Sequence, residues 1–253
     1  MKYGWQPDTP DFRDRVFCSG IAAAKFKLPP SADMRDLMPP VYDQGQLGSC
    51  TANAIAAAIQ YERRRQGFDN DFVPSRLFIY YNERNIEGTV GSDAGAMIRD
   101  GIKAVARLGD CNELEWPYDP SVFATEPSIA CYTNALKYRA VDYWRVPRDM
   151  VQMRGCLAAG YPFVFGFSVY SSFESPEVAS SGMVPMPAAG EQMLGGHAVL
   201  AVGYDDAKQC FLVRNSWGTQ WSAAMGGYFW LPYAFLLDEN LSNDMWVIKA
   251  EAA

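Results

Sequence analysis

The pattern of apolar and polar positions changes about halfway along the chain. In the first half, apolar residues recur at helical spacing between polar caps and glycine stops. This pattern predicts helices at residues 51–66, from Pro74-Ser75 through Tyr81, from Ser92 or Asp93 to Leu108, and at 149–159. The first half is therefore expected to be mainly helical.

The second half consists of short aromatic and β-branched runs separated by Gly, Asp or Lys, which is typical of strands. The runs are YPFVFGFSVY at 161–170, HAVLAVGYDD at 197–206, CFLVRNSW at 210–217 and GYFWLPY at 227–233. A helical half followed by a strand half predicts an α+β protein of two lobes, with a site between them.

The domain boundaries follow from the same pattern. Residues 1–27 mix charged residues and prolines without a sustained period, so they are expected to form an N-terminal extension. Residues 28–253 are expected to form the domain, with a helical lobe at about 36–138 and a β lobe at about 139–250.

Composition and charge exclude several classes of protein. The 253 residues are 49% hydrophobic and 20% charged, which is ordinary for a globular protein, and the net charge of −7 argues against a nucleic-acid partner. The basic run Arg63-Arg64-Arg65 falls in the last turn of a predicted helix, where cations are favoured. No apolar stretch approaches the ~18 residues of a membrane span. We expect a monomer, and the sequence leaves its compartment open.

Cys50 is the first candidate for chemistry. It lies at the start of the predicted helix 51–66, where the helix dipole and free backbone N–H groups favour a thiolate. Small neighbours, Gly48 and Ser49, leave the sulfur accessible. Taken alone, Cys50 would be better explained as a buried structural cysteine, which is what most cysteines are. The other cysteines permit disulfides without requiring them, and their pairing is open: Cys18, Cys111, Cys131, Cys156 and Cys210.

His197 is the only histidine in the chain, so any imidazole proton transfer must use it. It begins an apolar run after Gly195-Gly196, and these glycines clear space beside the ring. Asn215 ends the following predicted strand, where its side chain would select the tautomer of the imidazole, with Trp217 covering the bond. A packed histidine and an ordinary turn at NSWG are the structural alternatives.

The order Cys50, His197, Asn215 along the chain favours a catalytic role over these structural alternatives. The blocks QGQLGSC, GGHAVLAVGY and RNSWGTQW resemble the three signature blocks of the papain family of cysteine peptidases. Two further segments, LPPSADMRDLMPPVYDQG and GDCNELEWPYD, resemble that family's mature N-terminus and its aromatic-Pro-Tyr segment. The resemblance runs from about Leu28 to Val247 and is strongest for a short bacterial branch.

The resemblance implies a papain-like fold, with a helical lobe packed against an antiparallel, barrel-like β lobe and the active site in the cleft. It implies that Cys50 is the nucleophile, His197 the general acid/base and Asn215 its orienting residue, with Gln44 as the oxyanion donor. The implied reaction is hydrolysis of a polypeptide substrate through a thioester. Neither a cofactor nor a metal is implied, and the single histidine lacks the paired spacing of a zinc site.

Residues of the substrate cleft are also implied by loose alignment. Met97, Ile98 and Ala198 would line the pocket for the residue two before the scissile bond and favour an apolar side chain there. Gly95 would offer its backbone to an extended substrate, and the predicted substrate-binding set also includes Gly196 and Trp217. Helical core packing explains Met97 and Ile98 nearly as well. The chain departs from the family at Leu47, which stands in place of a cysteine, and at Thr51, which stands in place of a tryptophan.

Two hypotheses remain open at this point. The extension 1–27 is too short for the family's usual inhibitory segment, and it either lies against the cleft and limits access or is a surface tail. The leading function is a cysteine endopeptidase. An amidase, transpeptidase or exopeptidase would use the same residues, and a silent binding protein on the same scaffold is the competing class, although such a relative usually loses one of them.

Overall fold

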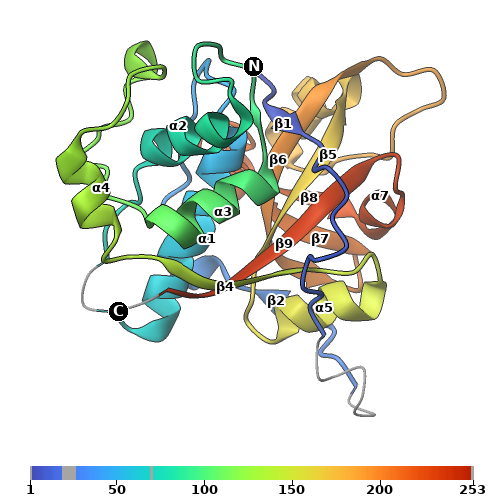
Figure 1. Ribbon diagram of the computed structural model, residues 1–253. Coiled ribbons are helices and arrows are strands. Elements are labelled where there is room, and N and C mark those ends of the chain that lie inside the picture. Colours follow the sequence, from blue (N-terminus) through green and yellow to red (C-terminus); the bar gives the residue numbers. More distant parts are fainter. Residues whose placement is uncertain (1, 19–26, 69–70, 252–253) are drawn as a thin grey trace.

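The structure is a computed structural model that describes residues 2–18, 27–68 and 71–251. In Figure 1, helices α1 to α4 gather on one side and the large sheet lies on the other. The described helices are α1 (Cys50–Gln66), α2 (Arg76–Glu87), α3 (Ile98–Leu108), α4 (Ile129–Ala135), α5 (Met150–Ala158), α6 (Pro176–Ser181) and α7 (Tyr233–Leu237). This arrangement confirms the predicted α+β class.

The described strands form a large sheet and a two-stranded pair. The pair is β1 (Trp5–Gln6) with β3 (Ala96–Met97), and the large sheet contains β2 (Ser31–Asp33), β4 (Ala140–Arg145), β5 (Phe163–Tyr170), β6 (Met193–Asp205), β7 (Cys210–Arg214), β8 (Tyr228–Pro232) and β9 (Ser242–Glu251). Its order is β4-β9-β5-β6-β7-β8, with β2 added to β6, and the pairings are antiparallel.

The described sheet is open, so "barrel-like" is too strong a description of this part of the chain. Strand β5 is buried along nearly its whole length, and the central part of β6 is buried as well. Both strands are central, with neighbours on each side and α1 packed against β6. Their continuous apolar runs reflect burial on both faces rather than on one.

Most of the predicted helices are confirmed. Helix α1 ends at Gly67, whose φ of 70° suits a glycine stop, and the side chain of Ser75 caps α2 by accepting a hydrogen bond from the Phe78 amide. The predicted start of the third helix is wrong. Helix α3 begins at Ile98, and Asp93 instead accepts a hydrogen bond from the Gly48 amide at 3.0 Å.

Three short helices were not predicted. Helices α4, α6 and α7 have 7, 6 and 5 residues. A helix of this length spans two turns or fewer, so it does not establish a hydrophobic period that sequence inspection can recognise. Their positions depend on packing against the rest of the domain.

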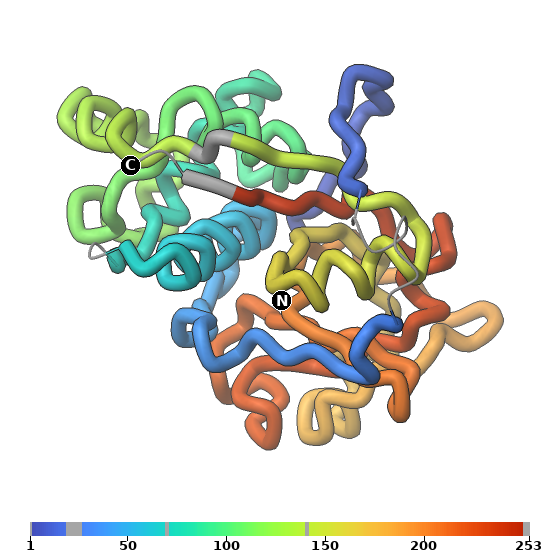
Figure 2. The backbone as a smooth tube through the Cα atoms, turned by 90° about the horizontal axis from the view of Figure 1, so that it is seen from below, coloured from blue at the N-terminus to red at the C-terminus, as the bar shows by residue number. Residues whose placement is uncertain are grey.

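The N-terminal segment, which we define as residues 2–18, follows the junction between the two sides of the molecule. Strand β1 pairs in parallel with β3 from the helical side, while Val16 forms a bridge with Arg145 at the end of β4. In Figure 2 this dark-blue segment passes close to the red C-terminal strand β9, whose Trp246 donates a hydrogen bond to Asp8 of the segment. The remainder of the predicted extension, residues 19–26, lies outside the described residues.

Candidate active site

Cys50 is the first residue of α1, as its sequence context predicted. Its side chain is fully buried, contrary to the accessibility that Gly48 and Ser49 suggested. The backbone amides of Ala198, Gly4 and Thr51 lie close enough to the sulfur to lower the pKa of the thiol. One of these donors follows His197 in β6 and one belongs to the N-terminal segment, so the thiol lies where α1, the sheet and this segment meet.

His197 and Asn215 lie on adjacent strands and are joined by a hydrogen bond. The distance from His197 Nε2 to Asn215 Oδ1 is 2.8 Å. Because the amide oxygen can only accept, Nε2 carries the proton and Nδ1 is left as the basic nitrogen. That Nδ1 is buried and has no hydrogen-bond partner among the described residues. Trp217 stacks on the imidazole, with ring centroids 4.9 Å apart and planes at 31°.

Gln44 is held so that its amide nitrogen faces the N-terminal segment. Ser216 Oγ donates to Gln44 Oε1 at 2.6 Å, which fixes the orientation of the side chain. Gln44 Nε2 then donates to the carbonyl oxygens of Leu47, at 2.9 Å, and of Lys2, at 3.2 Å. The donor that the resemblance assigned to an oxyanion therefore already holds a peptide oxygen.

The N-terminal segment fills the space around these side chains. At Gly4, an added Cβ would lie 1.8 Å from the Gly48 carbonyl oxygen, and at Gly95 an added Cβ would lie 2.1 Å from the Gly4 oxygen. Gly4 therefore passes through a gap that no other residue fits. The ring of Tyr3 lies edge-on to His197, with centroids 6.3 Å apart.

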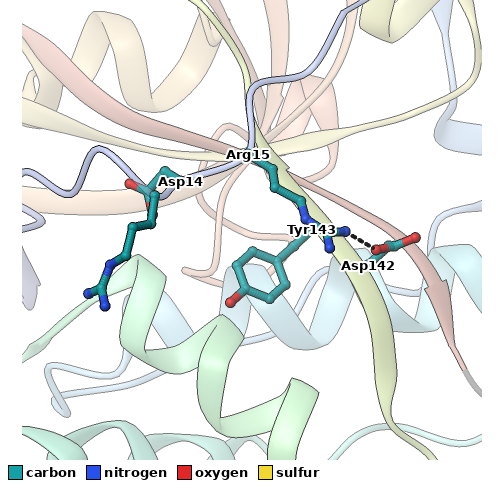
Figure 3. A pocket seen from close by; sticks show the side chains of 5 residues that line it. Asp14, Arg15, Asp142 and Tyr143 are labelled. Carbon is teal, nitrogen blue, oxygen red and sulfur yellow. Dashed lines mark hydrogen bonds and ion pairs between the residues drawn. The ribbon is translucent and has the colours of Figure 1, made fainter.

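The segment is held at several points along its length. Lys2 pairs with Asp93, and the Tyr3 hydroxyl donates to Glu174. Farther along, Arg15 Nη1 lies 3.0 Å from Asp142 Oδ1 on β4, beside a cavity of about 280 Å³ that also involves Asp14 and Tyr143 (Figure 3). The N-terminal segment is therefore held near both of its ends.

Burial dominates the proton affinities of the site. Burial raises the pKa of the Cys50 thiol to about 11, although the three backbone amides lower it. Burial also lowers the pKa of the His197 imidazole to about 4, while its bond to Asn215 acts in the opposite direction. With the segment in place, the two groups are a neutral thiol and a neutral imidazole at neutral pH.

The predicted substrate-binding residues fall into two groups. Gly95 and Gly196 contact the N-terminal segment closely, and Met97 pairs with Gln6 between β3 and β1. Ile98 is fully buried in the core as the first residue of α3. Ala198 is also fully buried, but its amide reaches the Cys50 sulfur, and Trp217 covers the imidazole.

Several residues at the site were not found from the sequence. Tyr3, Trp5 and Asp244 all line or fill the cleft, yet they lie in no recognised motif. Thr51, which follows Cys50 in α1, donates to the fully buried Glu83 at 2.6 Å. A tryptophan in a supposed tail was the one available signal, because exposed tryptophans are uncommon.

The described residues contain no group of three or more His, Cys, Asp or Glu side chains able to hold a metal ion. None of the helices in this part of the chain is long and apolar enough to cross a bilayer.

The chain is similar to known proteins over most of its length. A family model described as papain family cysteine protease matches residues 28–235. The crystal structure of xylellain, a cysteine protease from Xylella fastidiosa, is 48% identical, with a TM-score of 0.89 over 98% of this chain and 95% of that one.

Two curated proteins extend the comparison. An uncharacterized peptidase C1-like protein of Acanthamoeba polyphaga mimivirus is 45% identical over 82% of this chain and 68% of its own length. Cathepsin B-like CP3 of Giardia intestinalis is 29% identical over 86% and 73%. The expected similarity to a bacterial branch is confirmed by the xylellain match.

Proposed function

The chain belongs to the papain family of cysteine proteases, and from this premise we propose that it is an endopeptidase acting through Cys50, His197, Asn215 and Gln44. Cys50 is the nucleophile, His197 the general acid and base, and Asn215 the residue that orients the imidazole. Gln44 and the backbone N–H of Cys50 stabilise the oxyanion. We also retain residues 28–253 as the peptidase domain, working as a monomer.

The observation that carries this proposal is the position of a peptide in the cleft. The Lys2 carbonyl oxygen lies 3.2 Å from Gln44 Nε2, while the Gly4 amide lies close enough to the Cys50 sulfur to lower the pKa of the thiol. A peptide carbonyl therefore fits the donor beside the thiol without any rearrangement of Gln44. Preorganised donors of this kind are a major source of catalytic rate enhancement.

The reaction follows from the tautomer at His197. When substrate replaces the segment, the basic Nδ1 takes the thiol proton and the sulfur attacks the scissile carbonyl carbon. The carbonyl oxygen gains negative charge, which the Gln44 amide stabilises. The imidazolium then gives its proton to the leaving amine. Water, activated by the imidazole, then hydrolyses the thioester and releases Cys50. The hydrogen bond to Asn215 keeps the ring in position throughout.

The second part of the proposal is that the N-terminal segment limits access to the cleft. Its Gly4 directs an amide N–H at the sulfur rather than a carbonyl carbon, so the segment occupies the site without presenting a bond for attack. With the segment in place, Cys50, His197 and Gln44 are completely buried. The covered chain is therefore the less active form, and activity requires the segment to leave.

The preferred substrate is a polypeptide with an apolar residue two before the scissile bond. Small and apolar residues around the cleft, Gly95, Gly196 and Ala198, support this preference. Met97, half-buried at the edge of β3, belongs to the same surface.

Labelling of Cys50 by an epoxysuccinyl peptide tests the catalytic assignment. Labelling is expected in the Gly4→Ala chain and is expected to disappear in Gly4→Ala/His197→Ala, because the thiolate needs the imidazole. Equal labelling in both chains would contradict the assignment. Cleavage products of a denatured protein and of an N-terminally blocked peptide then separate an endopeptidase from an exopeptidase.

Gating is tested by turnover of a fluorogenic peptide before and after release of the segment. Deletion of residues 1–27 is expected to raise the rate, and an unchanged rate would rule out gating. Asp8 and Asp14 of the segment bond to the buried Arg99, so the deletion also removes both partners of this arginine. A point substitution in the segment keeps these partners in the chain and is therefore the cleaner test.

A further inference from the structure

The side chain of Trp5 fills a defined pocket beside the nucleophile. A Cβ added at Gly166 of β5 would lie 2.0 Å from Trp5 Cε2, and one added at Gly196 of β6 would lie 2.7 Å from Trp5 Cε3. The indole therefore lies directly on the backbone of two neighbouring strands, and both walls require glycine. Trp5 itself is buried.

The end of this pocket is a carboxylate. Trp5 Nε1 donates to Asp244 Oδ2 at 3.1 Å, and Asp244, from β9, is only 2% exposed. The same oxygen accepts the Asp8 amide at 2.8 Å. When the segment leaves, both donors leave with it, and Asp244 Oδ2 becomes an acceptor without a donor from the protein that faces the vacated pocket.

The other oxygen of this carboxylate is already paired. Arg145 Nη2 lies 2.8 Å from Asp244 Oδ1, and Arg145 comes from β4 rather than from the segment. The negative charge of Asp244 is therefore already balanced by Arg145, which pairs with the oxygen that does not contact Trp5. A guanidinium entering the pocket would meet Arg145 as a second cation, whereas a neutral N–H group would complete the hydrogen bonds without adding charge.

A substrate side chain has a direct route to this pocket. The neighbouring residue Gly4 brings its amide close enough to the Cys50 sulfur to lower the pKa of the thiol, and its carbonyl oxygen accepts a hydrogen bond from the Ala96 amide at 2.8 Å. An extended peptide that uses the Ala96 amide beside the thiol therefore places a side chain between Gly166 and Gly196.

We propose that the pocket bounded by Gly166, Gly196 and Asp244 is the side-chain specificity site of the cleft and selects tryptophan. The walls fit a flat ring, and Asp244 requires a neutral N–H at its edge. Hydrocarbon rings of the same shape leave Asp244 Oδ2 unpaired, and arginine meets Arg145. This inference rests on the proposed function and sharpens its apolar preference into one for an aromatic ring with a donor.

The test uses the full-length Gly4→Ala chain and peptides that differ at one residue: tryptophan, naphthylalanine, phenylalanine or arginine. Naphthylalanine matches the shape of tryptophan and lacks its N–H. We expect kcat/KM to be about tenfold or more higher for tryptophan than for naphthylalanine, because the site is built around a donor. Arginine is expected to be the poorest of the four.

Asp244→Asn provides the internal test. Arg145 holds the amide oxygen of the new side chain, so its NH₂ group faces the pocket and opposes the indole N–H. The preference for tryptophan over naphthylalanine is expected to disappear. Asp71→Asn removes the same charge away from the cleft, where Asp71 pairs with Arg64, and should leave the preference unchanged. Equal rates for the two rings, or a preference for arginine, would overturn the inference while leaving the proposed peptidase intact.

A second measurement does not depend on turnover. In the full-length chain, alkylation of Cys50 by iodoacetamide is followed by peptide mass spectrometry, with the exposed Cys18 as an internal reference. Trp5→Phe should raise the rate about tenfold when Asp244 is present and much less when it is combined with Asp244→Asn. Phe12→Ala, which removes a 99% exposed aromatic of the same segment, should have no effect. Equal acceleration by Trp5→Phe in both backgrounds would overturn the inference even if no peptide were cleaved.

Discussion

Gln44 Nε2 lies 3.2 Å from the carbonyl oxygen of Lys2, so the side chain proposed to hold a substrate's oxyanion is bonded to the protein's own N-terminal segment. On the proposed function, the segment and a substrate compete for the same donor. A substitution that prevents the segment from fitting should raise the catalytic rate. Removal of the Gln44 side chain should lower that rate even when the segment has been displaced.

Substitution of Gly4 tests the first consequence. An added Cβ would lie 1.8 Å from the Gly48 oxygen, and overpacking of this kind costs about 1–3 kcal/mol. Gly4→Ala should therefore raise peptidase turnover about tenfold or more, measured with a fluorogenic peptide. Gly91→Ala is the matched control, because an added Cβ there has no heavy atom within 4 Å among the described residues. A Gly4→Ala chain as slow as wild type would count against gating.

Substitution of Gln44 tests the second consequence. In the Gly4→Ala chain, Gln44→Ala should lower kcat about 10²–10³-fold with a small change in KM, because an oxyanion donor acts mainly in the transition state. Gln66→Ala serves as the control, since Gln66 bonds to Glu62 at the far end of α1. A larger change in KM than in kcat would indicate a role in substrate binding instead.

The stability of the covered chain should depend on pH through His197. Burial lowers the pKa of His197 from 6.5 to about 4, so at intermediate pH the unfolded imidazole binds a proton that the folded one does not. The contribution is fully present above about pH 6.5 and is lost as the pH falls toward 4. The loss amounts to about 3 kcal/mol in the free energy of unfolding.

His197 is the only histidine, so a comparison with His197→Asn isolates this effect. Denaturant unfolding at pH 7.5 and at pH 4 should show wild type losing its advantage over the variant as the solution is acidified. A constant difference between the two proteins would show that the imidazole keeps an ordinary pKa in the fold.

The arginine run at the end of α1 offers a test of buried charge. Arg63 Nη2 lies 2.5 Å from Asp110 Oδ1, and their side chains are 1% and 0% exposed. Asp110→Ala leaves Arg63 buried without this partner and should lower the free energy of unfolding by about 3–5 kcal/mol. Asp71→Ala, which breaks the exposed pair with Arg64, should cost less than about 1 kcal/mol. Similar losses in the two variants would contradict the distinction.

This arginine run also shows a limit of local inference. Its position in the last turn of a helix was predicted correctly, and the helix dipole was a sufficient local reason for three cations. The structure shows that each arginine has its own carboxylate, at Asp110, Asp71 and Glu62. Two of these partners lie outside α1, so no helical period could reveal them.

The start of α3 also shows a limit of local inference, here through a prediction that was wrong. Asp93 was a reasonable cap by residue type, yet it lies four residues before Met97 and bonds instead to Gly48, Tyr80 and Lys2. A carboxylate suits a helix cap and a backbone amide elsewhere equally well. Only the approach of the QGQLGSC turn decided between them.

The sequence by itself determined the α+β class, the helix that begins at Cys50, and the order of thiol, imidazole and amide along the chain, because caps, glycine stops and periodicity act between neighbouring residues. Only the tertiary structure decided that Tyr3 and Trp5 fill the cleft, that Asp244 closes its pocket, and that Cys50 and His197 are buried together. Those outcomes depend on contacts between residues more than 100 positions apart in several cases, and on the exclusion of water that such contacts produce.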